Sequence, residues 1–131
     1  MNLLLDTHVF LQYFAEPKKL SRSVLRILEG GQREVYVSAV TAWEMSIKVA
    51  LGKLKVPGEL SQYVRHRIRE AGFGELPISI DHALAVRALA SHHGDPFDRM
   101  LVAQAQVEGL AIVTGDEELL KYDVRTLPAY A

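Results

Sequence analysis

Four carboxylate side chains lie beside short apolar stretches of this chain. Asp6 directly follows an apolar run of three residues, and Asp116 closely follows another. Glu44 and Asp98 each lie near the start of a segment in which apolar residues have helical spacing. If the apolar runs are parallel strands, we expect the four side chains to meet at the carboxyl edge of the sheet, where open α/β folds bind ligands.

Carboxylates gathered at one place repel each other and attract a cation. Two carboxylates ~5 Å apart repel by about 3 kcal/mol at an effective dielectric constant of about 20. Few basic residues are near in the sequence: Arg99 adjoins Asp98, and Lys48 lies one helical turn after Glu44. Because oxygen ligands without cysteine suit hard ions, the expected cation is Mg²⁺ or Mn²⁺. Such an ion activates water for attack on a phosphodiester, which requires no nucleophile from the protein.

Helix capping is the alternative interpretation of each acid taken singly. Asp6 and Asp116 occupy plausible N-cap positions. Thr41 and Glu44 have the spacing of a capping box. Asp95 precedes a proline and is expected to cap a helix rather than to bind a cation. Capping does not require distant residues to converge, so convergence distinguishes the two interpretations.

Apolar runs and helical patterns alternate along the chain. Short apolar strands without period-two alternation are typical of a parallel sheet that helices cover on both faces. We therefore expect a single domain over residues 1–131, a three-layer α/β/α fold with a short parallel central sheet. The expected strands are 3–5, 35–37, 76–78, 111–113 and 124–127, with 76–78 near an edge because it contains a proline. The expected helices are 7–14, one capped by Ser21 and stopped by Gly30, 41–51, 60–71, 81–93, 96–108 and 116–121.

Composition narrows the class of protein further. The 131 residues carry a net charge of −1 and contain no cysteine. The net charge near zero excludes a basic tail and a highly charged disordered protein. The absence of cysteine excludes a disulfide scaffold. No apolar run approaches the ~18 residues that a membrane span needs. We expect a cytoplasmic protein that does not bind membranes.

One segment of the chain is locally basic. Residues 48–69 hold six basic side chains and one acidic side chain, which is consistent either with a patch for the RNA backbone or with a solvated helix face. Arg99 could pair with a carboxylate or reach a phosphate. The candidate RNA-binding residues are Lys48, Lys53, Arg65 and Arg99. The five histidines are expected to be ordinary surface or core residues.

The four acids belong to segments that occur together in a known family. These segments are LLLDTH at 3–8, SAVTAWEM at 38–45, HGDPFDRMLVAQA at 93–105 and IVTGD at 112–116. The chain resembles PIN-domain ribonucleases, specifically the VapC toxins of bacterial and archaeal type II toxin–antitoxin modules. The resemblance runs through nearly the whole chain in the family's order, which makes it highly specific.

The resemblance implies a Mg²⁺- or Mn²⁺-dependent endoribonuclease that hydrolyses RNA phosphodiester bonds. Asp6 and Asp98 match the firmest metal ligands of the family. Glu44 and Asp116 match the acids that complete the catalytic pocket, directly or through water.

The resemblance also implies neighbouring groups and partners. Thr114 matches a hydroxyl position beside the site, and Thr7 is expected to act similarly. The implied partners are an RNA substrate, a VapB-like antitoxin that occupies a groove of the toxin, and a second copy in a homodimer. Two other functions are alternatives: a divalent-ion-binding receiver-like module, which typically has paired acids where Asp6 stands alone, and a PIN-like scaffold without catalysis.

Overall fold

Within the residues that the structure describes, 1–90 and 94–130, five strands pair in parallel in the order β3-β2-β1-β4-β5. The structure is a computed structural model. The strands are β1 (Leu3–Leu5), β2 (Val35–Ser38), β3 (Gly74–Leu76), β4 (Ala111–Thr114) and β5 (Thr126–Pro128). The α-helices are α1 (Thr7–Ala15), α2 (Arg22–Glu29), α3 (Ala39–Ala50), α4 (Leu60–Ala71), α5 (Ile80–Ala85) and α6 (Pro96–Glu108). The 3₁₀ helices are η1 (Pro17–Lys19), η2 (Val86–Ala88) and η3 (Glu117–Lys121). None of the described helices has the length and apolar character needed to cross a membrane.

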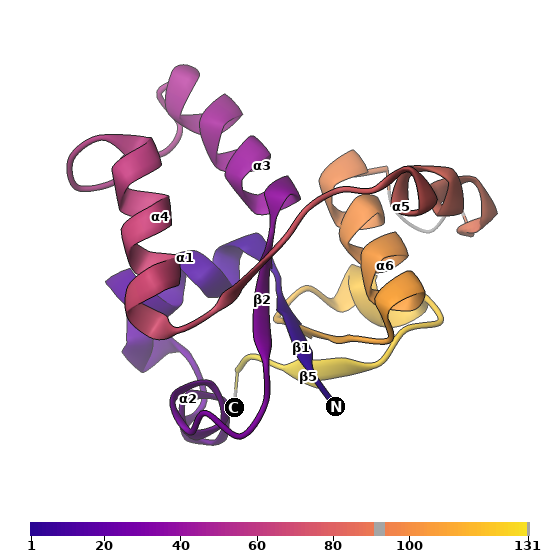
Figure 1. The fold of residues 1–131 in the computed structure, drawn as a ribbon, viewed down its shortest axis with the longest axis horizontal. Coiled ribbons are helices and arrows are strands. Elements are labelled where there is room, and N and C mark those ends of the chain that lie inside the picture. The colour runs from indigo at the N-terminus through magenta and orange to yellow at the C-terminus, as the bar shows by residue number, and fades with distance from the viewer. Residues whose placement is uncertain (91–93, 131) are drawn as a thin grey trace.

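Helices cover both faces of the sheet, which confirms the three-layer α/β/α fold. Leu3 and Leu5 point into a core that includes side chains of α1, α2 and α4, whereas Leu4 points into a second core formed with α6. All three leucines are fully buried, because successive side chains of a strand alternate between faces and both faces are covered. Figure 1 shows α1, α2 and α4 on one side of the strands and α5 and α6 on the other.

The direction of the strand order reverses next to β1. From β1 the chain adds β2 and β3 on one side, then crosses the sheet through α6 to add β4 and β5 on the other. Ligands of open α/β sheets bind where the order reverses, outside the carboxyl ends of the strands. Leu5 pairs with Val113 in the register of β1 and β4. Asp6 and Thr114, one residue further along each strand, therefore lie side by side at this point.

Several boundaries differ from those expected. The strand expected at 76–78 is Gly74–Leu76, because its position is set by pairing with β2, and the Tyr36 ring lies where a side chain at Gly74 would be. It is an edge strand, as expected. The last strand begins two residues late and ends at Pro128, and residues 117–121 form a 3₁₀ helix. The helix expected at 81–93 ends at Ala85 and continues as η2; its last three residues lie outside the described part of the chain.

Candidate active site

Asp6 lies at the junction of β1 and α1 with its side chain almost fully buried, 3% exposed. Its Oδ1 accepts a hydrogen bond of 2.8 Å from the Thr7 amide, and its Oδ2 accepts one of 2.7 Å from the Thr114 hydroxyl. Burial raises the pKa of Asp6, and the negative charge of Glu44 raises it further, while His8 and the two hydrogen bonds act in the opposite direction. The fold thus keeps a carboxylate whose negative charge is only partly compensated.

Thr114 connects Asp6 to the turn that follows β4. Its Oγ1 donates to Asp6 and also accepts a hydrogen bond of 3.0 Å from the Asp116 amide. The Asp116 carboxylate accepts from the Glu118 amide at 2.9 Å and caps η3. Asp116 therefore has the capping role expected of it, and the Thr114 hydroxyl links its backbone amide to the Asp6 carboxylate.

Glu44 is a buried carboxylate in the middle of α3, 7% exposed, and it does not cap that helix. The capping-box interpretation of Thr41 and Glu44 is wrong, because β2 runs directly into α3 and Ser38 caps the helix with its hydroxyl, 2.9 Å from the Val40 amide. Lys48, one turn further, places its Nζ 2.7 Å from Glu44 Oε2. Capping therefore does not explain the burial of this carboxylate.

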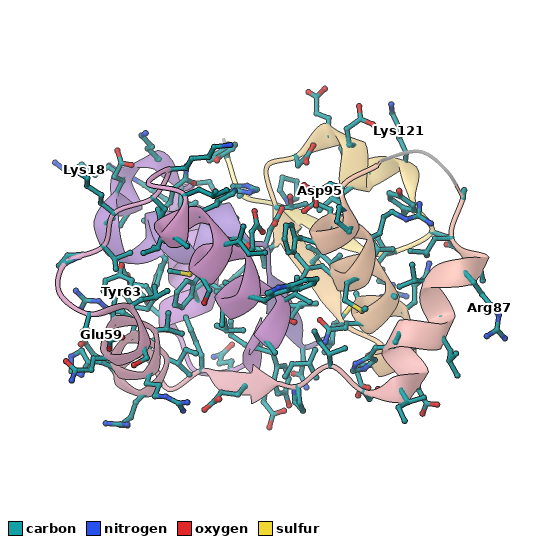
Figure 2. The ribbon with its side chains drawn as sticks, turned by 90° about the horizontal axis from the view of Figure 1, so that it is seen from above. Lys18, Glu59, Tyr63, Arg87, Asp95 and Lys121 are labelled. Carbon is teal, nitrogen blue, oxygen red and sulfur yellow. The ribbon has the colours of Figure 1, made fainter. Side chains whose placement is uncertain are left out.

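Asp98 is the third buried carboxylate, 8% exposed, in the first turn of α6. Asp95 caps this helix, as expected: its Oδ1 accepts from the Phe97 amide at 2.8 Å and from the Asp98 amide at 3.2 Å. Figure 2 looks down on this edge of the sheet, with Asp95 labelled at the start of α6. Because Asp95 supplies the cap, the carboxylate of Asp98 is not needed for that purpose.

Lys48 shows that the acids of α3 and α6 share one neighbourhood. The hydrogen bond to Glu44 raises the pKa of Lys48, and the charges of Glu44, Asp95 and Asp98 raise it further. The charge of Glu44 also acts on Asp6. Glu44 therefore lies within electrostatic range of Asp6, and Lys48 lies within range of Glu44, Asp95 and Asp98.

The side of α3 that carries Glu44 also contacts the start of α1. Thr41, Glu44 and Lys48 have the three- and four-residue spacing of one helix face. The Thr41 hydroxyl lies 3.1 Å from the Thr7 hydroxyl in a buried hydrogen bond. Thr7 thus holds α3 against α1 and touches Asp6 through its amide, which places it beside the site.

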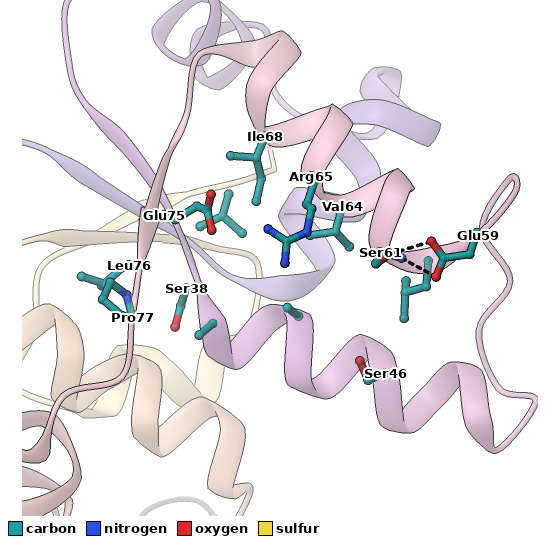
Figure 3. A pocket seen from close by; sticks show the side chains of 14 residues that line it. Ser38, Ser46, Glu59, Ser61, Val64, Arg65, Ile68, Glu75, Leu76 and Pro77 are labelled. Atoms are coloured by element: carbon teal, nitrogen blue, oxygen red, sulfur yellow. Dashed lines mark hydrogen bonds between the residues drawn. The ribbon is translucent and has the colours of Figure 1, made fainter.

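The opposite side of α3 faces a groove of about 550 Å³ bounded by α4 and β3. Figure 3 shows Arg65 extending from α4 over this groove, near Glu75 of β3. Small side chains of α3 form its floor; they are Ala39, Ala42 and Ser46. Arg65 is therefore separated from Glu44 by α3, whereas Lys48, another candidate RNA-binding residue, contacts Glu44 directly.

The two other candidate RNA-binding residues, Lys53 and Arg99, lie in different surroundings. Lys53 is exposed beyond the C-terminal end of α3. The guanidinium of Arg99 donates to the carbonyl oxygens of Ala90 at 2.9 Å and Val86 at 3.4 Å, and to the Tyr122 hydroxyl at 3.3 Å. These bonds give Arg99 a structural role between α6 and the chain that precedes it.

His8 is a residue at the site that the sequence reasoning missed. Its Nδ1 lies 3.3 Å from Asp6 Oδ2, and its Nε2 accepts a hydrogen bond of 3.0 Å from the Gly115 amide. Side chains of a helix point back toward its N-terminus, so the second residue of a helix that starts at the sheet edge can reach that edge. The place of His8 as the second residue of that helix is therefore the feature of the sequence that could have assigned it to the site.

The donor set fits a hard divalent cation by its chemistry. Asp6, Glu44 and Asp98 offer carboxylate oxygens from three buried side chains, and Mg²⁺ and Mn²⁺ prefer such ligands. Among the described residues, however, no three His, Asp or Glu side chains are grouped so that they could hold a metal ion as they stand. An ion would therefore have to draw the carboxylates closer together.

Parallel strands in this order, with the buried carboxylate of Asp6 where the order reverses, define an open α/β domain. A profile of the PIN domain matches residues 3–125, and the chain belongs to the PIN domain family. Ribonuclease VapC22 of Mycobacterium tuberculosis is 30% identical to it over 127 residues, which cover 89% of this chain and 88% of that protein. PIN-domain ribonucleases generally depend on divalent metal ions.

Solved structures share the fold. VapBC2 of Rickettsia felis, bound to a DNA fragment from its promoter, includes a chain with a TM-score of 0.73 and 13% identity over the full length of both chains. A toxin–antitoxin complex from Klebsiella pneumoniae includes one with a TM-score of 0.66 and 23% identity over 98% of both chains. These likenesses confirm the fold.

Proposed function

We propose that this chain is a VapC-like toxin, an endoribonuclease that hydrolyses RNA phosphodiester bonds with the help of Mg²⁺ or Mn²⁺. The observation that carries the proposal is a set of three buried carboxylates, Asp6, Glu44 and Asp98, in which the charge of Glu44 acts on Asp6 and the charges of Glu44 and Asp98 both act on Lys48. Asp6 also caps α1 by accepting from the Thr7 amide, as expected, yet burial still raises its pKa, because a buried carboxylate is costly unless a cation or a proton compensates it. The similarity to ribonuclease VapC22 supports the chemistry.

Each acid has a distinct place in the proposed site. Asp6 and Asp98 would hold the ion, and Glu44 and Asp116 would complete its surroundings, directly or through water. When bound, the ion would lower the pKa of a water molecule and stabilise the leaving oxygen of the phosphodiester.

Other residues of the chain would orient these acids. Thr114 aims the Asp6 carboxylate, and Thr7 joins α1 to α3 beside it. Lys48 compensates the charge of Glu44 while about half of its side chain stays exposed, so its ammonium group is available to an RNA phosphate at the mouth of the site.

The proposed partners follow from the same class of protein. We propose a VapB-like antitoxin that binds this chain and blocks cleavage, a homodimer as the working form, and the cytoplasm as the location. Support for the antitoxin comes from the toxin–antitoxin complexes whose chains share this fold. We also propose that residues 1–131 act as one domain, in keeping with the profile match over residues 3–125.

A non-catalytic PIN-like scaffold is the second candidate, and one observation favours it. No three acidic or histidine side chains of the described residues are arranged as a ready metal site. The match to the PIN domain leaves no support for a receiver-like module.

Metal-dependent cleavage separates the two candidates. The purified chain, incubated with single-stranded RNA, is expected to cleave it in Mg²⁺ or Mn²⁺, to stop in EDTA and to recover when the ion is restored. Internal cuts, seen as new RNA ends on sequencing, identify an endonuclease. A folded chain that leaves RNA intact in both ions would support the scaffold and overturn the proposed activity.

A further inference from the structure

His8 forms a bridge between the ends of two strands at the proposed metal site. The ring nitrogen Nε2 accepts a hydrogen bond from the Gly115 amide, so this nitrogen carries no hydrogen. In a neutral imidazole the hydrogen is then on Nδ1, which lies 3.3 Å from Asp6 Oδ2. The two contacts of the ring thus fix a single tautomer.

We propose that His8 is a positioning residue, whose neutral imidazole presents Nδ1–H to Asp6 and Nε2 to the Gly115 amide and so sets which oxygen of Asp6 faces a bound cation. This inference rests on the proposed function, because it concerns the orientation of a proposed metal ligand. His8 itself is not a ligand, since both of its nitrogens already face protein groups.

The distribution of donors around Asp6 shows what the bridge does. Each carboxylate oxygen offers about two acceptor sites in its plane. Oδ2 faces both the Thr114 hydroxyl and His8 Nδ1, whereas Oδ1 accepts from the Thr7 amide. More acceptor capacity therefore remains on Oδ1, which under this proposal is the oxygen that Asp6 would offer to an ion.

Packing from the C-terminal segment holds the ring in place. The Tyr130 ring lies 6.2 Å from the His8 ring, centroid to centroid, at 34°. Its hydroxyl donates to Gln12 Oε1 at 2.9 Å. A Cβ added at Gly115 would lie 2.0 Å from Tyr130 Cε2, so only glycine allows this ring to close over the turn. The imidazole is thus confined by α1, by the turn after β4 and by Tyr130.

Hydrogen-bonding groups in other metal proteins indicate how much the loss of His8 should change metal affinity and activity. Groups that orient metal ligands by hydrogen bonding usually change metal affinity or activity by about 10-fold to 100-fold when they are removed. Fixing Gly115 also fixes its neighbour Asp116, another acid of the proposed site. Loss of the bridge should therefore lower Mn²⁺ affinity and kcat, while KM for RNA changes little.

Two variants separate the contact of the His8 ring with Asp6 from its contact with Gly115. His8→Asn can place an amide N–H where Nδ1–H stands but cannot reach Gly115, and His8→Gln can place an amide oxygen where Nε2 stands but presents no donor to Asp6. We expect His8→Gln to lose about 10-fold in Mn²⁺ affinity by calorimetry and a similar factor in kcat, and His8→Asn to lose less. His66→Gln, which alters an exposed histidine paired with Glu70, is the matched control and should equal wild type.

The tautomer is tested without any metal. The ¹⁵N shifts of His8 in the metal-free protein should show a protonated Nδ1 and an unprotonated Nε2; the opposite tautomer would overturn the inference. The inference would also be overturned if wild type, His8→Gln and His8→Asn bound Mn²⁺ with equal affinity. It would be overturned as well if both variants lost the same Mn²⁺ affinity and this loss accompanied a fall in Tm. If wild type binds Mn²⁺ but cleaves no RNA, the proposed activity fails while the positioning of Asp6 stands or falls on the affinities. If wild type binds no Mn²⁺, both fail.

Discussion

The Thr114 hydroxyl donates a hydrogen bond of 2.7 Å to Asp6 Oδ2, although the two residues are 108 positions apart in the chain. This bond joins β1 to β4 where the strand order reverses. The same hydroxyl accepts from the Asp116 amide. One small side chain thus orients a proposed metal ligand and anchors the turn that carries another acid.

Thr114→Val keeps the shape of this side chain and removes its hydroxyl. We expect a loss of about 10-fold to 100-fold in Mn²⁺ affinity, because the Asp6 carboxylate loses a donor that orients it. Folding stability should fall by about 1 kcal/mol, the usual net contribution of one hydrogen bond. Thr126→Val makes the same change on β5 and should leave Mn²⁺ affinity at the wild-type value; equal losses in both variants would contradict the role given to Thr114.

Lys48→Met removes the cation that contacts Glu44. Because a bound divalent ion and the ammonium group repel each other, we expect Mn²⁺ affinity to rise, on the order of tenfold at low salt. KM for RNA should rise as well, since the variant lacks a charge for the phosphate backbone. Lys55→Met, a charge loss at an exposed position, is the control. Weaker Mn²⁺ binding in Lys48→Met would show that the lysine supports the ion rather than competing with it.

Asp6→Asn should change how the Tm depends on pH and should remove the effect of Mn²⁺ on the Tm. The pKa of Asp6 is raised mainly by burial, so the folded protein holds its proton more firmly than the unfolded chain does. The stability that this group gives to the folded protein is present below its usual pKa of 3.8 and is lost as pH rises through the raised pKa. Asn caps helices about as well as Asp and does not ionise.

The Tm of metal-free Asp6→Asn, relative to wild type in EDTA, should therefore increase as the pH is raised from about 4 to about 7. Excess Mn²⁺ should raise the Tm of wild type but not of the variant, since a ligand stabilises only the state that binds it. A Tm difference that stays constant over this pH range would contradict the burial penalty assigned to Asp6.

Local signals in the sequence predicted some elements closely. The bounds of α6, Pro96–Glu108, follow from a capping aspartate, a proline at the first position and a glycine just after the end. The bounds of α4, Leu60–Ala71, likewise end at a glycine with positive φ. For both helices, the residues that determine where the helix begins and ends are adjacent to it in the sequence.

Other features depended on contacts that the sequence does not display. Gly74 begins β3 because the Tyr36 ring of the neighbouring strand covers it. Ser38, rather than Thr41, caps α3 because β2 leads into the helix without a loop. That Asp6, Glu44 and Asp98 meet follows from sheet topology and family resemblance and stays a prediction, whereas the contact of His8 with Gly115 joins residues 107 positions apart.

The central claim, that the buried acids act on RNA and do not merely cap helices, is tested most directly by two aspartates three positions apart. Asp95→Asn retains a good cap for α6, and Asp98→Asn changes only the buried carboxylate of the same turn. Cleavage of single-stranded RNA in Mn²⁺, with the Tm of each variant measured alongside, should persist in Asp95→Asn and disappear in Asp98→Asn while both stay folded. Wild-type cleavage rates in Asp98→Asn would contradict the proposed active site.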